Sequence, residues 1–362
     1  ANSAGLRVFF LVCIWLWGGQ VSGQLLINEM VSSNQWQLQD QFGNFPDWLE
    51  VVNTGTDTLD LSQYYLSDDP ADPFMWQFPA MPFAPGNYMV VFASGEDLPV
   101  EPLYWHTLVN MGDSMHYLLP DQEIGDSWKE PGFVPSSWPE GRSGFGYSDD
   151  DDSTVVANTM SIYLRKPFTV ENVDQIRELE LYMDYDDSFI AYLNGTEIAR
   201  RNLGSPGSTV TYNQAAADLH EALMYRSEPP ERFRVNDPAT LLREGENILA
   251  VEVHNISTSS SDLTAIPFLV AAMNTRHAAY RAGNPYLTLA DQYPHAAFRI
   301  DRDGEQVYLS DHAGSPLDSL FSGDIPPNHS YGRVPGVPGT WGYFHTPTPA
   351  APNETTYFTE YH

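Results

Sequence analysis

Residues 47–53 of the sequence read Asp-Trp-Leu-Glu-Val-Val-Asn, a short run in which apolar and β-branched side chains predominate. Residues 25–30 and 88–92 form two further runs of this kind. Apolar residues recur mostly at every second position in these runs, which favours β-strands over helices. The alternation also predicts that Trp48 and Leu49 lie on opposite faces of a sheet, with one of them in the core.

The same pattern continues in the second half of the chain. Strands are predicted at residues 176–183 and 189–193, and Asn194-Gly195 after the second strand favours a tight hairpin turn because both residues tolerate a positive φ. Only residues 213–225 and 274–282 have a brief helical spacing. Many short strands at intervals of about 8 to 12 residues are typical of packed antiparallel sheets. The sequence therefore predicts an all-β fold.

The chain is strongly acidic, with 48 acidic residues, 17 basic residues and a formal net charge of −31. Such a chain repels nucleic-acid phosphates and anionic membrane surfaces, so neither is expected as a partner. An acidic surface keeps a protein soluble at high salt, and it can also collect calcium. Cys13 is the single cysteine, so stability must come from buried apolar cores, and 362 residues suffice for two domains.

The first 23 residues have the composition of a bacterial Sec signal peptide. Arg7 precedes the apolar stretch 8–17, and the small residues Val21 and Gly23 suit cleavage before Gln24. The apolar stretch is shorter than the roughly 20 residues of a membrane-spanning helix, so a membrane anchor is the less favoured alternative. We therefore expect a secreted protein, extracellular or at the cell surface, without membrane insertion after cleavage.

Several stretches resemble the lamin tail domain, in the order of that family. The opening stretches are Leu26-Ile27-Asn28-Glu29-Met30, Asp47-Trp48-Leu49-Glu50-Val51-Val52-Asn53, Leu59-Asp60-Leu61, Tyr65-Leu66-Ser67-Asp68-Asp69, Trp76-Gln77-Phe78-Pro79, residues 85–93 and Trp105-His106-Thr107. The closing stretches are residues 304–309, Ser330-Tyr331-Gly332-Arg333, Trp341 and residues 348–353. The resemblance implies an immunoglobulin-like β-sandwich, split into residues 24–120 and 276–353, with residues 354–362 as a linker to a further C-terminal region.

The intervening residues 121–275 resemble the galactose-binding-like jelly rolls that accompany lamin tail domains in secreted bacterial proteins. The stretches that carry this resemblance are Ser137-Trp138, Gly144-Phe145-Gly146-Tyr147, residues 163–168, Tyr185-Asp186-Asp187-Ser188-Phe189, residues 192–197 and residues 246–255. The resemblance implies a β jelly-roll domain inserted into the sandwich. Several such proteins continue into a chitobiase-like module and a CotH-like kinase domain, which would lie beyond His362.

No local signature of catalysis occurs in the sequence. Gly141-Arg142-Ser143-Gly144 lacks the spacing of a nucleophile elbow, and there is no His-Glu-x-x-His zinc motif or phosphate-binding loop. Scattered carboxylates are too abundant in so acidic a chain to indicate a glycosidase pair by themselves. We therefore expect residues 1–362 to be non-catalytic.

Polar side chains cluster at the ends of two predicted strands of the jelly roll. Asp184, Asp186 and Asp187 precede one strand, and His254, Asn255, Ser261 and Asp262 follow another. If these strands are antiparallel neighbours, the carboxylates of Asp184, Asp186, Asp187 and Asp262 converge on one rim and suit a calcium ion, the one cofactor expected. His254 and Asn255 would then bind sugar hydroxyls, with Trp128, Trp138 or Tyr147 as a stacking face. The alternative is that the polar groups cap turns and the tryptophans belong to the core.

Three functions remain open on these grounds. The favoured one is a non-catalytic extracellular binding or attachment module that recognises a carbohydrate or cell-surface ligand through the jelly roll, with the sandwich as scaffold. A second is the ancillary N-terminal region of a CotH-like kinase or other secreted surface enzyme, whose catalytic domain would lie downstream and be a partner in the same polypeptide. A third is a purely structural envelope protein.

Overall fold

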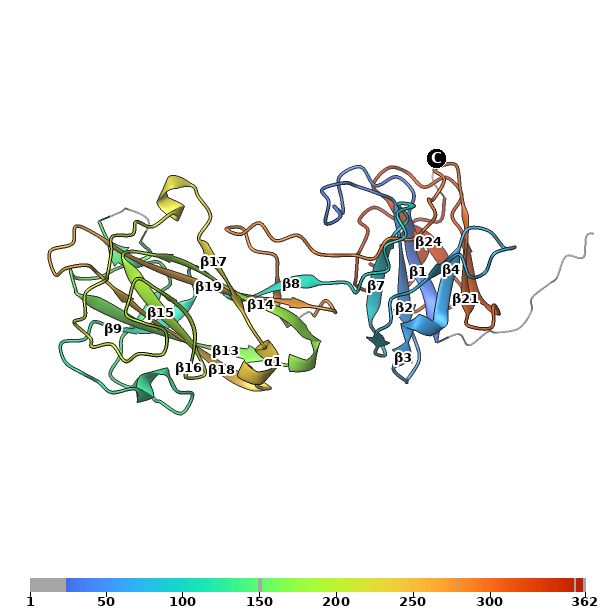
Figure 1. Ribbon diagram of the computed structural model, residues 1–362. Coiled ribbons are helices and arrows are strands. Elements are labelled where there is room, and N and C mark those ends of the chain that lie inside the picture. Colours follow the sequence, from blue (N-terminus) through green and yellow to red (C-terminus); the bar gives the residue numbers. More distant parts are fainter. Residues whose placement is uncertain (1–23, 149–151, 278, 355, 361–362) are drawn as a thin grey trace, which may run out of the picture.

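The computed structural model describes residues 24–148, 152–277, 279–354 and 356–360. The expected signal peptide, residues 1–23, lies outside the described residues. The protein is all-β and forms two separate lobes, each a β-sandwich (Figure 1). Within the described ranges, no helix is long and apolar enough to cross a membrane.

The first sandwich combines the N-terminal and C-terminal parts of the chain. Its larger sheet has the strand order β24-β23-β1-β2-β7, and the opposing sheet has the order β22-β21-β4-β5. The strands of the larger sheet are β24 (Trp341–Phe344), β23 (Ser330–Arg333), β1 (Leu25–Val31), β2 (Trp48–Asn53) and β7 (Tyr88–Phe92). Those of the opposing sheet are β22 (Pro316–Phe321), β21 (Gln306–Asp311), β4 (Tyr64–Ser67) and β5 (Trp76–Gln77), while β3 (Leu59–Asp60) pairs with β6 (Pro82–Phe83).

The expected alternation on β2 is confirmed. Leu49 belongs to the core between the two sheets, whereas Trp48 packs on the opposite face with Tyr104 and Tyr293. Both side chains are fully buried. The outer face of β2 is therefore covered by the segments that lead to and from the second sandwich.

The second sandwich is built from two larger sheets. One has the order β10-β9-β13-β18-β15-β16, and the other has the order β12-β11-β19-β14-β17. The first sheet consists of β10 (Glu140–Arg142), β9 (Ser114–Leu118), β13 (Ser161–Val170), β18 (Gly245–His254), β15 (Ser188–Leu193) and β16 (Thr196–Arg201). The second consists of β12 (Thr154–Val155), β11 (Phe145–Tyr147), β19 (Leu263–Met273), β14 (Ile176–Tyr185) and β17 (Glu231–Val235), and β8 (Tyr104–Val109) pairs with β19 and with β20 (Arg281–Ala282).

Helical structure is limited to single turns within the described residues. Helix α1 (Pro238–Leu241) and the 3-10 turns Leu61–Gln63, Ser127–Lys129, Val173–Gln175 and Met224–Arg226 connect strands. The helical spacing of residues 213–225 therefore yields only the last of these turns. Elsewhere in this segment some backbone N–H groups donate to side chains at strand ends: the N–H of His220 donates to Asp187, which lies between β14 and β15.

The boundaries between the two sandwiches differ from the expected ones. We expected the first sandwich to continue to residue 120 and to resume at residue 276. Instead β8 pairs with β19 and β9 pairs with β13, so residues 104–118 already belong to the second sandwich. The stretch Trp105-His106-Thr107, assigned to the first sandwich by resemblance, is part of β8. A short alternating strand fits either sheet, and its sequence does not specify its partner.

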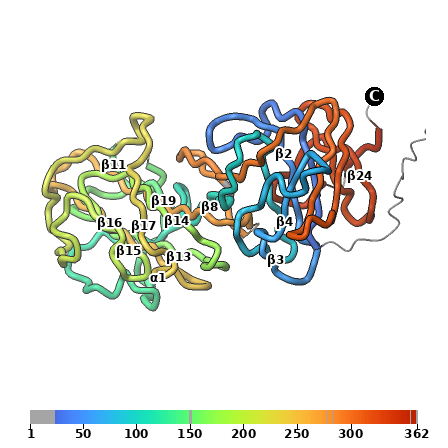
Figure 2. Tube along the Cα trace, turned by 45° about the vertical axis from the view of Figure 1, so that its right-hand side comes forward, coloured from blue at the N-terminus to red at the C-terminus, as the bar shows by residue number. Residues whose placement is uncertain are grey.

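Two connecting segments run between the sandwiches and contact each other. Isolated bridges link Leu98 to His295 and Leu103 to Gln292. Figure 2 shows the two lobes still side by side after the view is turned, with β8 between them. The entry and exit of the insertion therefore lie next to each other, as insertion into a surface loop requires.

Two buried glutamates join the separated halves of the first sandwich. Glu29 accepts hydrogen bonds from the Ser330 hydroxyl and from the backbone N–H of Thr348, the latter at 3.1 Å. Glu50 accepts one from the backbone N–H of Ala350. Burial raises the pKa of Glu29 from 4.5 to about 7, and burial together with the nearby Glu29 raises the pKa of Glu50. The two carboxyls thus hold the segment that follows the insertion against the strands that precede it.

Candidate functional site

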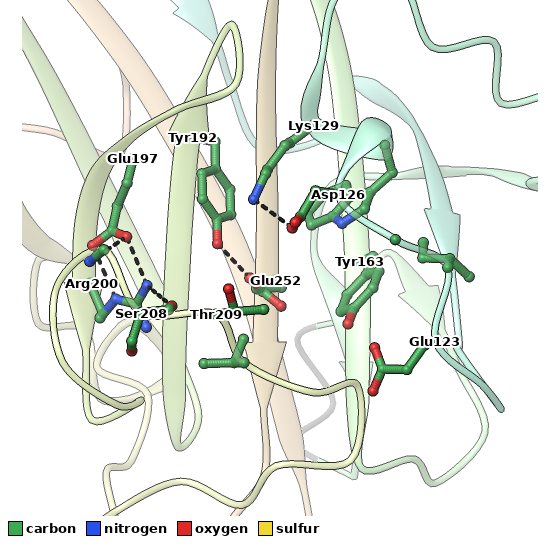
Figure 3. Close-up of a pocket in the computed structure, with 15 residues that line it drawn as sticks. Glu123, Asp126, Lys129, Tyr163, Tyr192, Glu197, Arg200, Ser208, Thr209 and Glu252 are labelled. Carbon is green, nitrogen blue, oxygen red and sulfur yellow. Dashed lines mark hydrogen bonds and ion pairs between the residues drawn. The ribbon is translucent and has the colours of Figure 1, made fainter.

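A polar pocket lies on the outer face of the sheet that contains β13, β18 and β15 (Figure 3). Its volume is about 130 Å³. This is smaller than the roughly 300–1,000 Å³ of pockets for drug-sized ligands, so it suits a small group such as one sugar ring. Its lining residues are Glu123, Ile124, Gly125, Asp126, Trp128, Lys129, Tyr163, Tyr192, Glu197, Arg200, Gly207, Ser208, Thr209, Val210 and Glu252.

The alternation of the strands places three polar side chains on the floor of this pocket. Leu249 and Val251 of β18 point into the core between the sheets, so Glu252 faces the other way. Tyr163 lies directly opposite Glu252 on β13, and the Tyr192 hydroxyl of β15 donates a hydrogen bond to Glu252 at 2.7 Å. Figure 3 shows the two tyrosines on either side of Glu252.

Glu252 is also held from the end of its own strand. The Nε2 atom of buried His254 lies 3.1 Å from Oε2 of Glu252, and Nδ1 lies 2.9 Å from the carbonyl oxygen of Gln214. A carbonyl oxygen only accepts, so Nδ1 carries a proton. The second hydrogen bond then needs another proton, either on Nε2 or on the carboxyl group of Glu252. In both arrangements the His254–Glu252 pair has no net charge.

Trp128 supplies an aromatic wall to the pocket. Its ring stacks on Tyr163 with centroids 4.7 Å apart and an interplanar angle of 12°. The segment that carries it is held to the sheet by Arg165 of β13, which donates to the carbonyl oxygens of Trp128 at 2.6 Å and Phe133 at 3.1 Å. The pocket wall is therefore fixed by a buried guanidinium.

Two ion pairs form the charged walls. Lys129 Nζ lies 2.8 Å from Asp126 and 4.6 Å above the ring of Tyr192. Arg200 binds Glu197 through two of its nitrogens, at 2.7 and 3.0 Å, which holds the pKa of that carboxyl below its usual value. Arg200 also donates to the carbonyl oxygens of Leu203 and Ser208 and so braces the loop over the pocket.

Burial raises the pKa of the Tyr163 hydroxyl, and the carboxylates of Glu252 and Glu123 raise it further. Burial also raises the pKa of Tyr192, whose hydroxyl is bonded to Glu252. Both phenols therefore keep their protons. The Tyr163 hydroxyl can donate a hydrogen bond to a ligand, whereas the Tyr192 hydroxyl, whose proton is donated to Glu252, can accept one.

The predicted ligand-binding residues do not form one site. Trp128 lines the pocket, while Trp138 packs behind it in a small apolar cluster and His254 lies behind Glu252. Tyr147, on β11 of the opposing sheet, and Asn255, just after β18, are buried and bond to each other, Asn255 Nδ2 donating to Tyr147 Oη at 3.0 Å. Trp128 and Trp138 are both buried in the same apolar cluster, so the core interpretation fits both tryptophans. Neither Tyr147 nor Asn255 lines the pocket.

Two of the four predicted calcium ligands are engaged in holding loops. Asp184 accepts backbone N–H groups of Leu223 and Met224 at 2.6 and 3.1 Å. Asp187 accepts those of His220 and Ile256 at 3.0 and 2.7 Å. This is the turn-capping role given above as the alternative to metal binding.

The other two predicted ligands do converge. Asp186 and Asp262 lie with Glu221, which was not predicted, so that one carboxylate oxygen from each is within 4.8 Å of the others. Three hard oxygen donors fit part of the six- to eight-oxygen shell that calcium takes. These three residues would hold the ion, and a bound calcium would tie the strand ends to the 214–226 segment.

Most residues of the pocket were not predicted from the sequence. Tyr163, Tyr192 and Glu252 were part of the resemblance to jelly rolls but were not singled out as site residues. The signal that identifies them is strand alternation, because each lies at an outward position flanked by core residues. Lys129 and Arg200 come from a loop and an edge strand, and their convergence depends on the tertiary fold.

Comparisons with known proteins give only distant structural similarity. No protein-family model matches the chain, and no curated protein matches it. A β-glucuronidase from an uncultured Clostridium sp. aligns with TM-score 0.32 and 12% identity over 62% of this chain and 45% of its own. A glycosyl hydrolase family 2 member from Bacteroides cellulosilyticus has TM-score 0.31 and 10% identity over 60% and 36%. The chain thus spans less than half the length of these two enzymes.

Proposed function

We propose that this chain is a non-catalytic, extracellular carbohydrate-binding module whose ligand binds in the pocket beside Trp128. The observation that carries the proposal is the composition of the pocket floor, where two protonated tyrosines flank a carboxyl group on the outer face of the sheet. Carboxyl, hydroxyl and ammonium groups such as these bond the hydroxyls of a sugar ring.

The arrangement of the carboxyl groups favours recognition over hydrolysis. A glycosidase needs one carboxyl group as acid and a second as base or nucleophile across the scissile bond. Here Glu197 is clamped by Arg200, Asp126 is paired with Lys129, and Glu252 accepts from Tyr192 and contacts His254. In this proposal the first sandwich, with its resemblance to lamin tail domains, is a scaffold that presents the second.

A glycan array probed with the protein, with and without a calcium chelator, tests the proposed function. We expect selective retention on a subset of glycans that share one terminal sugar, because the pocket accommodates about one ring. Binding that persists with the chelator would show that the contacts to the glycan do not depend on calcium, as expected for the pocket. Failure to retain any glycan under either condition would contradict the proposal and leave a scaffold role.

Calcium is expected to stabilise the second sandwich through Asp186, Glu221 and Asp262. Since an ion that binds only the folded state stabilises it by about 2.7 kcal/mol at 100 times its Kd, millimolar calcium should raise the Tm. Thermal melts with calcium and with chelator check this. Asp262→Asn should remove the shift, while the exposed control Asp174→Asn should keep it. An identical Tm in calcium and chelator would show that these carboxylates only cap turns.

A further inference from the structure

Three carboxyl groups of the pocket leave no unbalanced negative charge. Asp126 pairs with Lys129 and Glu197 with Arg200. The His254–Glu252 pair has no net charge, as the hydrogen bonds of His254 require. Arg200 also donates to two loop carbonyls. Lys129 and Arg200 are thus each paired with a carboxylate, and the pocket has no unpaired positive charge for an anionic ligand.

Glu123 is the remaining carboxylate of the pocket. Among the residues that the structure describes, no lysine, arginine or histidine forms an ion pair with it. The backbone N–H of Tyr212 donates to its Oε1 at 3.2 Å, which fixes the carboxylate at the pocket mouth beside Tyr163. Figure 3 shows Glu123 close to the Tyr163 hydroxyl. The pocket thus presents one fixed negative charge, that of Glu123, next to the stacked rings of Trp128 and Tyr163.

From this charge balance we infer that the pocket selects an amino sugar, binds the corresponding neutral sugar more weakly and rejects uronic acids. The inference rests on the proposed function, because it concerns which sugar the same pocket takes. The ammonium group of the ligand lies against Glu123, and its hydroxyl groups face the polar side chains of the pocket. A uronic acid would place its carboxylate against Glu123 with no cation to offset the repulsion.

Titration with glucosamine, glucose and glucuronic acid, and with the three galacto-configured counterparts, tests the inference at low ionic strength and mildly acidic pH. We expect the amino sugar of the preferred configuration to bind about two- to fivefold more tightly than the neutral sugar, as one exposed ion pair provides. This margin should shrink at high salt. We expect no saturable binding of either uronic acid.

Glu123→Gln keeps the hydrogen bond from Tyr212 and removes the charge, so it should abolish the preference for the amine while neutral sugars bind as before. Glu140→Gln, on the exposed edge strand β10 of the same sheet, is the matched control and should leave the preference intact. Equal binding of all three sugar types, or tighter binding of a uronic acid, overturns this inference but leaves the proposed function standing. If neither these sugars nor any arrayed glycan binds, the proposed function fails with it.

Discussion

Replacing Glu50 by alanine is expected to destabilise the first sandwich by about 3–4 kcal/mol. The side chain is fully buried and accepts hydrogen bonds from Asn28 Nδ2 at 2.8 Å and from the backbone N–H of Ala350. Each donor left unsatisfied in the interior costs about 1–3 kcal/mol, and the cavity adds to that loss. Urea unfolding followed by tryptophan fluorescence measures the effect, with the unfolding of the second sandwich as an internal reference.

Glu50→Gln is the matched control for this change. Burial raises the pKa of Glu50, and both of its carboxyl oxygens accept an N–H group, Oε1 from Asn28 and Oε2 from Ala350. Glutamine fills the same volume but keeps only one acceptor oxygen, so we expect a loss of about 1–3 kcal/mol, smaller than that of alanine. Equal destabilisation by alanine and glutamine would show that the hydrogen bond kept by glutamine does not hold the C-terminal segment.

The first sandwich is also expected to lose stability as the pH rises through neutrality, because of Glu29. Its pKa is raised from 4.5 to about 7 in the folded protein, so folding favours the protonated form. The stabilisation is complete below pH 4.5 and is lost as the pH rises through about 7. A shift of this size corresponds to about 3 kcal/mol. Unfolding free energies measured across this pH range, for wild type and Glu29→Gln, isolate the contribution.

Glu29→Gln should be less dependent on pH than wild type and more stable than wild type at mildly alkaline pH. Glu96→Gln, which changes an exposed glutamate of the connecting segment, should follow the wild-type profile. A constant difference between wild type and Glu29→Gln over the whole range would contradict the account. Glu29 would then be ionised throughout or protonated throughout.

The sequence was a good guide to local structure and a poorer guide to strand partners. Alternation placed Trp48 and Leu49 on opposite faces, and Asn194-Gly195 forms the β15–β16 hairpin with φ values of 51° and 87°. The assignment of residues 104–118 to the first sandwich was wrong because pairing with β19 and β13 is a non-local choice. Local patterns fix which residues face a core, but they do not say which core.

For the site, sequence reasoning found Trp128 and the rim carboxylates but not the pocket. The aspartates near residue 186 are visible because they lie close together in the chain. Asp186 converges with Asp262, whereas Asp184 and Asp187 cap turns. The pocket joins β13, β15, β18 and two long loops, so no short motif contains it. Arg165 and Arg200, which hold those loops, donate to carbonyl oxygens that carry no sequence signature.

The claim that a sugar binds in the pocket is tested most directly by titrating the best glycan of the array against wild type, Lys129→Ala and Lys166→Ala. Lys129 lies in the pocket wall, whereas Lys166 is on β13 of the same sheet and donates to the carbonyl of Ser114 at 3.0 Å. Loss of a charged hydrogen bond at Lys129 should weaken binding about tenfold, with Lys166→Ala unchanged. Wild-type affinity in a folded Lys129→Ala variant would contradict this placement of the ligand.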